Sequence, residues 1–356
     1  MFCCVLFSVG CDKIFNDSST SNWEQLGKSF ESIIYNVISD KDGKIYVSGG
    51  DIGNVSVWDG ANWSQLGNAS ETFSGGVYWP ITIDNAGNVF AVGRIRVPQA
   101  NSTYNVAKWN KSTNTWINLT SDKVLFDNGI DAIATDANGN LYVAGKAQHI
   151  AGIESGAYIY KWNGSTWNIL GAKMLAGSEI LLYIDKLNNI YCSFGINDNA
   201  SPYIAKWNGT SWDELGGKNS ANFGIGYLLC INSDSQGNVY AGGYFTDGSK
   251  AYNIYKWTKA SNKTSAMYTH GNSLEANSIA FDSADTLYVA GDFTNSIDKR
   301  YIAKYHLDRD QWSDYWNLNA NGKIKSICFD KNGNMYAGGE FTNSEKKYYV
   351  AVYKKK

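Results

Sequence analysis

Apolar and polar residues alternate over short segments throughout the chain, and each segment ends in a turn signal. In one stretch NSIAFD (277–282) alternates into a turn and TLYVAG (286–291) alternates again. YIAKYH (301–306) and QWSDYW (311–316) follow them. Apolar–polar alternation over about four to eight residues is typical of β-strands. The pattern therefore predicts a unit of four short antiparallel strands.

This unit repeats seven times. A turn motif, D-x-x-G-N-x-Y or a near variant, begins at Asp40, Asp84, Asp136, Asp185, Asp234, Asp282 and Asp330. A second motif, apolar-x-K-W or a near variant, places an aromatic residue at Trp58, Trp109, Trp162, Trp207, Trp257, Tyr305 and Tyr353. The two series interleave without exception. Four strands in a repeat of about 48 residues are typical of a β-propeller blade.

The two ends of the chain complement each other. The last repeat stops at YYVAVYKKK (348–356) without a W-x-x-L-G segment, and NWEQLG (22–27) supplies one ahead of the first repeat. We expect residues 22–27 to pair with residues 348–353, because closure of a ring removes exposed sheet edges. The predicted fold is all-β, a seven-bladed β-propeller of four-stranded antiparallel blades closed by its N-terminal strand. Residues 22–356 would form this single domain, and we expect a monomer.

The glycine-rich strands resemble a known group of repeats. YVSGG (46–50), YAGGYFT (240–246), YVAGDFT (288–294) and YAGGEFT (336–342) are each followed by a K-W or K-Y strand or a near variant. They resemble seven-bladed propellers of the kelch and galactose-oxidase central-domain kind, and the delta-60 type repeats of bacterial surface proteins. The resemblance covers about residues 22 to 353 and implies the fold. Such propellers include enzymes, lectins and scaffolds.

The N-terminal residues MFCCVLFSVGC (1–11) are apolar and change abruptly to polar residues. They resemble the end of a truncated bacterial lipoprotein signal, with Gly10 before Cys11 as the acylated residue. A cleaved secretory signal or an artefactual N-terminus are the alternatives. Residues 12–21 would then be a linker. We expect an extracytoplasmic lipoprotein at the cell envelope or surface, or alternatively a secreted protein.

Charge and reactive residues exclude several functions. The formal charge of −2 gives no basic footprint for nucleic acid, so contact with a membrane would be only through a lipid anchor. Three cysteines lie in predicted strands and are expected to be buried free thiols: Cys192, Cys230 and Cys328. The histidines occupy unrelated positions: His149, His270 and His306. The copper ligands of galactose oxidase cannot be placed here, and we expect no metal, no cofactor and no catalytic residue.

The repeated turns have a backbone explanation. Asp caps the first turn of each repeat and Gly takes a positive φ, which favours a structural role over calcium binding. In YIYKWNGSTWNILG (158–171), Asn-Gly predicts a type I′ hairpin. Several N-x-S/T sequons fall on such turns and are weak evidence of a eukaryotic secretory origin: Asn62, Asn118, Asn163, Asn208 and Asn262. Trp162 and Trp167 are expected to pack between blades, or alternatively to form one sugar site per blade.

Function is expected on the face that does not repeat. The loops from the second to the third strand and between blades are long and differ from repeat to repeat, whereas the other turns are short and repeated. Five positions before each turn Asp, the residues are heterogeneous, and we expect five of them to surround the mouth of the central channel and contact a ligand: Tyr35, Trp79, Asp131, Asn277 and Lys325. The alternative is that strand ends tolerate variety.

These observations predict a non-enzymatic binding or scaffold module that uses its variable loop face. The partner would be a protein or a polysaccharide. Two alternatives remain open: a lectin with several equivalent sites, and a carbohydrate-active enzyme with its site at the channel mouth.

Overall fold

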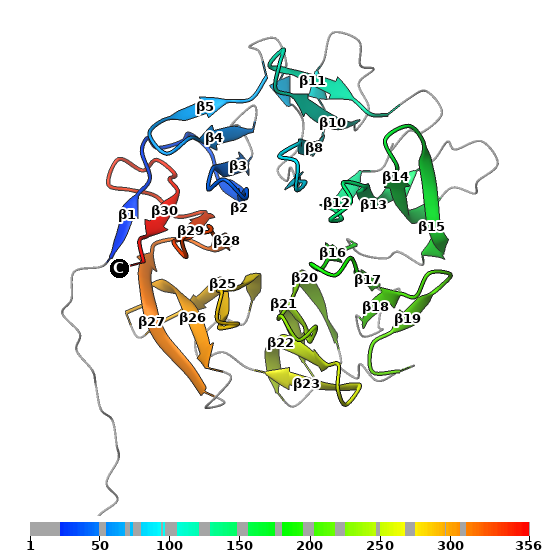
Figure 1. Cartoon of the computed structure of the whole chain (residues 1–356). Helices are drawn as coiled ribbons and strands as arrows, with labels where there is room; N and C mark the ends of the chain where they lie inside the picture. The colour runs from blue at the N-terminus through cyan, green and yellow to red at the C-terminus, as the bar shows by residue number, and fades with distance from the viewer. Residues whose placement is uncertain are drawn as a thin grey trace, which may run out of the picture.

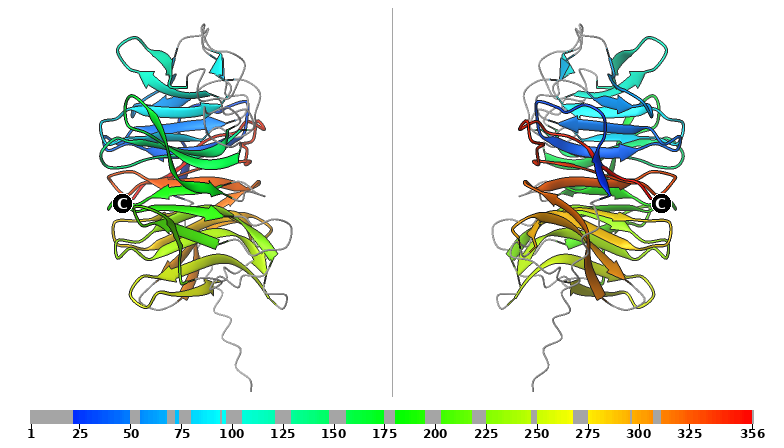
Figure 2. Two further views of the ribbon diagram at one scale, coloured as in Figure 1. Left: turned by 90° about the vertical axis from the view of Figure 1, so that its right-hand side faces the viewer. Right: turned by 90° about the vertical axis from the view of Figure 1, so that its left-hand side faces the viewer.

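The computed structural model describes the chain over residues 22–49, 55–67, 72–73, 80–93, 95–96, 105–120, 129–147, 156–174, 180–194, 203–217, 225–246, 250–267, 275–295, 297–306 and 311–355. Every regular element in these ranges is a β-strand. Seven four-stranded sheets are arranged as blades of a ring (Figure 1). Seen from the side, the ring is a flat disc whose strands run through its thickness (Figure 2). The predicted seven-bladed β-propeller is confirmed.

Within each blade the four strands are ordered from the inner to the outer edge of the ring, as follows. Blades 1 and 2 hold β2 (Ile34–Ser39), β3 (Ile45–Gly49), β4 (Ser56–Trp58), β5 (Trp63–Gln65); and β7 (Ile81–Ile83), β8 (Val89–Gly93), β10 (Asn105–Asn110), β11 (Thr115–Asn118). Blades 3 and 4 hold β12 (Ile130–Thr135), β13 (Leu141–Ala147), β14 (Gly156–Trp162), β15 (Trp167–Met174); and β16 (Leu182–Ile184), β17 (Ile190–Phe194), β18 (Tyr203–Trp207), β19 (Trp212–Glu214).

The later blades follow the same order. Blades 5 and 6 hold β20 (Ile225–Ser233), β21 (Val239–Thr246), β22 (Ala251–Thr258), β23 (Lys263–Met267); and β24 (Ala276–Phe281), β25 (Leu287–Thr294), β26 (Arg300–His306), β27 (Gln311–Ala320). Blade 7 holds β28 (Ile324–Phe329), β29 (Met335–Gly339), β30 (Ala351–Tyr353) and β1 (Trp23–Gln25). A separate small ribbon pairs β6 (Thr72–Phe73) with β9 (Ile95–Arg96). No helix in the described ranges is long and apolar enough to cross a membrane.

Blade 7 is built from both ends of the chain, as predicted. β1 pairs antiparallel with β30, with Trp23 opposite Tyr353. The backbone N–H of Leu26 then donates to the Val350 carbonyl at 2.8 Å. Leu26 and Phe30 are buried against blades 7 and 1. The ring is therefore closed by hydrogen bonds and by apolar burial.

The hydrophobic core is divided among the seven spaces between neighbouring blades. Each of seven clusters of buried residues draws its members from two adjacent sheets. Between blades 3 and 4, for example, Tyr142 and Ile159 pack with Cys192 and Ala205. Both faces of a blade are therefore apolar, which explains the buried runs of the second strands.

The paired tryptophans join each of blades 1 to 4 to the blade before it. In four blades the fourth-strand indole N–H donates to a leucine carbonyl of the preceding blade: Trp63 to Leu26 at 2.7 Å, Trp116 to Leu66 at 3.3 Å, Trp167 to Leu119 at 2.9 Å and Trp212 to Leu170 at 3.4 Å. Most of these rings are half-buried, and Trp116 is fully buried. The predicted packing between blades accounts for the W-x-x-L-G segment, because its Leu supplies the acceptor.

The glycine of this segment makes room for the next blade's rings. A Cβ on Gly171 would lie 2.8 Å from Trp212 Nε1 and 2.9 Å from Trp207 Cζ3, and the residue has a φ of +84°. Gly164 has a φ of +102° with nothing within 4 Å of such a Cβ. An alanine at either site bears a backbone cost of about 1–3 kcal/mol. Only at Gly171 is overpacking added.

We expect Gly171→Ala to lower the free energy of unfolding by about 1–3 kcal/mol more than Gly164→Ala does. Chemical denaturation of the two variants measures the difference. Equal losses would mean that the tryptophan pair does not pack tightly on the preceding blade.

The turn between the first and second strands has the predicted chemistry. In blade 3 the Asp136 carboxylate accepts the backbone N–H groups of Asn138 and Asn140, and Gly139 has a φ of +80°. The second carboxylate oxygen accepts the Tyr142 hydroxyl at 3.0 Å. Burial and the nearby Asp136 charge raise the pKa of Tyr142. The D-x-x-G-N-x-Y motif is therefore one connected structural unit.

The prediction of a type I′ turn at Asn163-Gly164 is wrong. That turn needs a positive φ at both central residues, and Asn163 is not among the described residues with positive φ. Its side-chain oxygen instead accepts the backbone N–H groups of Ser165 and Thr166. This local bond holds a four-residue loop between the paired Trp162 and Trp167, because an Asn side chain competes for backbone donors.

Candidate functional site

The long loops that differ between repeats lie mostly outside the described residues. These loops are RIRVPQANSTYN (94–105), KAQHIAGIESGA (146–157), GNASETFSGGVY (67–78) and GGKNSANFGIG (216–226). Trp79 and residues 1–21 with Cys11 also lie outside them, as do His149 and His270. The site described below is therefore built from the strand ends that carry these loops.

Four of the five predicted ligand contacts occupy one structural position. Tyr35, Asp131, Asn277 and Lys325 each lie at a register shift between the first and second strands of their blades. Leu229 lies at the same shift in blade 5. A β-bulge leaves one residue unpaired and changes the direction of its side chain. These five members of the heterogeneous series are therefore bulges on the inner strands.

Glycines on the second strand make these bulges possible. A Cβ on Gly243, Gly291 or Gly339 would overlap a backbone oxygen in the first strand or in the residue just before it. The overlapped oxygens belong to Tyr227, Glu275 and Lys323, in that order. Because only glycine permits this close approach, the last Gly of YAGG, YVAG and YAGG fixes the position of the first strand's backbone at this point.

The same arrangement places further side chains that sequence reasoning missed. The residue after each glycine lies opposite the overlapped residue: Tyr244 pairs with Tyr227, Asp292 N–H donates to the Glu275 carbonyl at 3.0 Å, and Glu340 N–H donates to the Lys323 carbonyl at 2.8 Å. The sequence does contain a signal for these positions. In YAGGYFT, YVAGDFT and YAGGEFT, the residue before F-T is Tyr, Asp or Glu.

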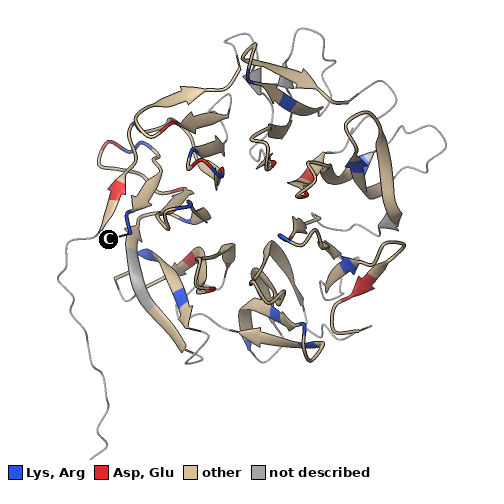
Figure 3. Cartoon of the chain, in the orientation of Figure 1, with Lys and Arg blue, Asp and Glu red and all other residues tan. Residues whose placement is uncertain are grey.

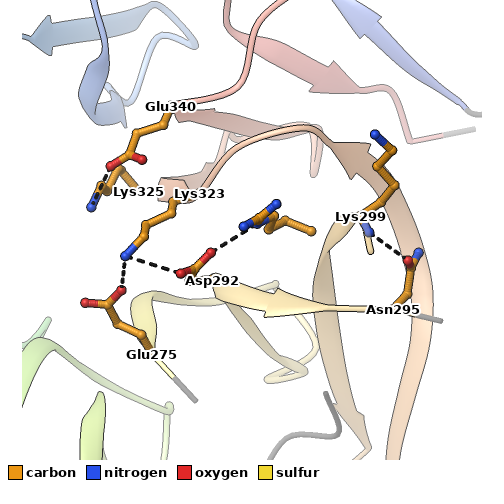
Figure 4. Close-up of polar contacts among 8 residues, drawn as sticks. Glu275, Asp292, Asn295, Lys299, Lys323, Lys325 and Glu340 are labelled. Carbon is orange, nitrogen blue, oxygen red and sulfur yellow. Dashed lines mark hydrogen bonds and ion pairs between the residues drawn. The ribbon is translucent and has the colours of Figure 1, made fainter. Parts of the chain in front are cut away.

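Ion pairs connect these positions across blades 6 and 7. Lys323 Nζ lies 2.7 Å from a Glu275 oxygen and 3.2 Å from an Asp292 oxygen (Figure 4). Arg300 Nε approaches Asp292 at 3.0 Å, and Lys325 pairs with Glu340 at 3.1 Å. All six side chains are between 18% and 33% exposed. The hydrogen bond from Lys323 to Glu275 raises the pKa of the lysine.

Aromatic and amide groups border the ion pairs. The Tyr227 hydroxyl donates to Glu275 at 3.4 Å, and its ring is 6.0 Å from the Tyr244 ring. The Nδ2 atom of Asn277 is shielded from solvent and has no hydrogen-bond partner. In blade 1, burial and the charge of Glu340 raise the pKa of Tyr35. We call the following set the rim cluster: Tyr227, Tyr244, Glu275, Asn277, Asp292, Arg300, Lys323, Lys325 and Glu340.

The structure separates the five predicted residues. Asn277 and Lys325 belong to the rim cluster, and Tyr35 is near its Glu340. Asp131 lies on blade 3, where its carboxylate accepts the backbone N–H of Ile180 in blade 4 at 3.2 Å. Asp131 therefore joins blades 3 and 4, whereas the rim cluster lies on blades 5 to 7.

Other candidate groups are not part of the rim cluster, although the Cys230 sulfur lies 3.8 Å from the carbonyl of Ala276, between Glu275 and Asn277. Cys192 is buried, Cys230 and Cys328 are half-buried, and all three are free thiols. Burial raises the pKa of Cys230 to about 12, so its reactive thiolate form is scarce at neutral pH. His306 Nε2 is 3.3 Å from the Ser313 hydroxyl. No three His, Cys, Asp or Glu side chains in the described ranges come together as a metal site would require.

Charges of both signs are interspersed around the ring (Figure 3). Within the rim cluster, three acidic side chains face three basic ones in the ion pairs above. The site is therefore electrically balanced, and it offers fixed hydrogen-bonding groups beside exposed aromatic surface.

Sequence comparison connects the last blades with a described propeller family. A family model of the Rax2 C-terminal β-propeller domain matches residues 250–356. This range begins before the third strand of blade 5 and includes blade 6 and three of the four strands of blade 7, which carry most of the rim cluster. The sequence matches none of the curated proteins with which it was compared.

Solved structures with the same fold have diverse functions. The extracellular domain of the putative one-component system BT4673 from B. thetaiotaomicron is 13% identical with a TM-score of 0.62, covering 94% of this chain and 40% of that one. Virginiamycin B lyase from Staphylococcus aureus is 12% identical with a TM-score of 0.62, covering 93% of this chain and 98% of that one. The GH74 xyloglucanase from Xanthomonas campestris is 14% identical with a TM-score of 0.60, covering 90% of this chain and 52% of that one.

The chain thus spans 40% of the length of the first of these structures. At these identities the likeness establishes the propeller fold alone. The narrower resemblance to kelch and galactose-oxidase propellers stays a prediction.

Proposed function

We propose that the protein is a non-enzymatic binding module that contacts its partner through the rim cluster. One observation carries this proposal. The glycines and the bulges repeat from blade to blade, whereas the side chains that they position differ and bear functional groups: Tyr227, Glu275 and Lys323 on one strand end, and Tyr244, Asp292 and Glu340 on the next. A repeated scaffold that presents non-repeating polar groups is the usual basis of specific recognition.

The hairpin tryptophans are the alternative location for a binding site, and their groups are already used in contacts between blades. The indole N–H groups of Trp63, Trp167 and Trp212 already donate to carbonyl groups of preceding blades. The rings of Trp63 and Trp212 also lie close to Gly27 and Gly171 of the preceding blades. These rings therefore have a structural role that leaves less surface for one equivalent sugar site per blade.

We further propose an extracytoplasmic location. The likeness to the extracellular domain of a bacterial sensor supports it, and so does the apolar N-terminal segment that precedes Cys11. Acylation of Cys11 would hold the propeller at the cell envelope, and a cleaved secretory signal would release it. Mass spectrometry of the N-terminus of the protein from its own cells separates the two.

Binding of the labelled full-length protein to the surface of the cells that encode it tests the proposed function. We expect Glu275→Gln combined with Lys325→Gln to lower binding at least about tenfold. Leu187→Ser should bind as the unaltered protein does, because Leu187 is 68% exposed in a repeated turn on the opposite face.

Melting curves serve as the control for folding, since half-exposed ion pairs contribute only about 1 kcal/mol each. If the double variant bound normally, or if Leu187→Ser lost binding equally, the rim cluster would not be the recognition surface.

A further inference from the structure

The charges of the rim cluster are already satisfied by one another. Each of the three carboxylates lies within 3.2 Å of a lysine or arginine nitrogen. A ligand with a full charge of either sign would have to separate one of these pairs, which leaves a half-buried charge without its partner. The cluster therefore favours an uncharged ligand.

The same groups retain hydrogen-bonding capacity. A carboxylate has about four acceptor positions, and a lysine has three donors. Within the described residues, Lys323 directs its ammonium group to two acceptors, Glu275 and Asp292. Ion pairing holds these groups in fixed orientations, so they accept and donate hydrogen bonds without further ordering. Such an array suits a ligand with several hydroxyl groups, each of which both donates and accepts.

Aromatic surface lies directly beside this array. Tyr227 is 45% exposed, which is unusual for a large side chain in this structure, and its cross-strand partner Tyr244 is half-buried. The Tyr227 hydroxyl is bonded to Glu275, so its ring is held next to the carboxylate. A flat aromatic ring packs against the C–H face of a pyranose, and the adjacent carboxylate accepts hydrogen bonds from its hydroxyl groups.

Asn277 adds a donor that the protein does not satisfy. Its Nδ2 atom is shielded from solvent without a hydrogen-bond partner. A shielded donor without a partner costs about 1–3 kcal/mol, and such groups in native structures call for an explanation. Asn277 lies on β24, two residues after Glu275, and β24 packs beside β28, which carries Lys325. An acceptor reaches this amide when the Asn277 side chain turns toward the rim, and a ligand hydroxyl is a suitable one.

From these observations we infer that the rim cluster binds a neutral carbohydrate, with a sugar ring packed on Tyr227 and its hydroxyl groups bonded to Glu275, Lys323 and Asn277. This inference rests on the proposed binding function and gives it a ligand class. It places the carbohydrate at one site on blades 5 to 7, in contrast to equivalent sites on every blade.

An array of defined glycans tests the ligand class. Neutral β-glucans, mannans and xyloglucan are printed beside anionic alginate, polygalacturonate and heparin, and the full-length protein is applied at low and high salt. We expect binding to at least one neutral glycan that changes little with salt, because Coulomb attraction between ligand and protein is screened by ions and hydrogen bonding is not. Binding confined to anionic glycans, or binding to none of the six, overturns the inference.

Variants at Tyr227 then locate the site. On the bound glycan we expect Tyr227→Ala to weaken binding at least about tenfold, and Tyr227→Phe, which keeps the ring, to weaken it no more than about threefold. Asn277→Leu should also weaken binding. Ile297→Ala is the matched control, since Ile297 is 65% exposed between β25 and β26 on the same face and is not part of the cluster. If Tyr227→Ala and Ile297→Ala behaved alike, the carbohydrate would bind elsewhere.

Treatment of cells separates failure of this inference from failure of the proposed function. Periodate destroys vicinal diols of glycans, and protease removes surface proteins. Loss of rim-dependent cell binding after periodate supports a carbohydrate. Rim-dependent binding that survives periodate and is lost after protease leaves the proposed function intact and replaces the carbohydrate with a protein. Binding that is unaffected by the rim variants refutes both.

Discussion

Deletion of residues 1–27 is expected to open the ring and cause the largest loss of stability of any change proposed for this protein. The deletion removes β1 and Leu26, which together form the outer part of blade 7. Burial of a leucine side chain alone stabilises by about 1.5–3 kcal/mol. The half-buried Trp23 ring, 5.6 Å from Tyr353, adds to the loss. We expect a total loss of more than about 4 kcal/mol in the free energy of unfolding.

Deletion of residues 1–21 is the matched control, because it leaves β1 and its pairing with β30 in place. Thermal melting and size-exclusion chromatography measure both variants. The longer deletion should melt at lower temperature and also form oligomers, since the uncovered edge of β30 is free to pair with another chain. If both deletions melted alike and stayed monodisperse, closure by β1 would contribute nothing to the ring.

The fold was predictable because its determinants repeat. Asp136, Gly139 and Tyr142 form a connected turn, and the same residue types recur at the same spacing in nearly every blade. Seven copies of a weak local motif at a nearly regular spacing exclude most other architectures. The closure of blade 7 was also visible in the sequence. The last repeat has no W-x-x-L-G segment, and the segment with Trp23 and Leu26 precedes the first repeat.

The site was only partly predictable, because it depends on pairings between strands. The series with Asn277 and Lys325 was visible as heterogeneity at a fixed offset, but the alignment gave no sign that each residue lies in a bulge. Gly291 lies so close to the Glu275 backbone that a Cβ would overlap it, and the two positions are 16 residues apart in the sequence. Identifying Glu275 and Lys323 as site residues required that spatial relation. The prediction of a type I′ turn was wrong for a different reason. The side-chain oxygen of Asn163 accepts the backbone N–H groups of Ser165 and Thr166, and these bonds stabilise a four-residue loop.

The dependence of the site on glycine gives a second prediction with a large effect. Gly243→Ala should lower the free energy of unfolding by about 3 kcal/mol or more, because the new methyl group overlaps the backbone oxygen of Tyr227. Backbone cannot rotate away as a side chain does. The start of β20 must therefore move, and Tyr227 with it. Denaturation measures the stability, and the glycan array measures the binding.

The adjacent Gly242 provides the control for this interpretation. A Cβ there would lie 2.6 Å from the Cys230 sulfur, which is a side-chain atom. We expect Gly242→Ala to be destabilising and to regain part of the loss when combined with Cys230→Ala, since that change removes the sulfur. The same second substitution should not help Gly243→Ala. If Cys230→Ala rescued both glycine variants equally, the bulge would be flexible, and a fixed backbone would not explain how blade 5 positions Tyr227. Rescue confined to Gly242→Ala would show that Gly243 is required to position the backbone of β20. Through that strand, Gly243 also positions Tyr227, one of the side chains that distinguish blade 5 from the other blades.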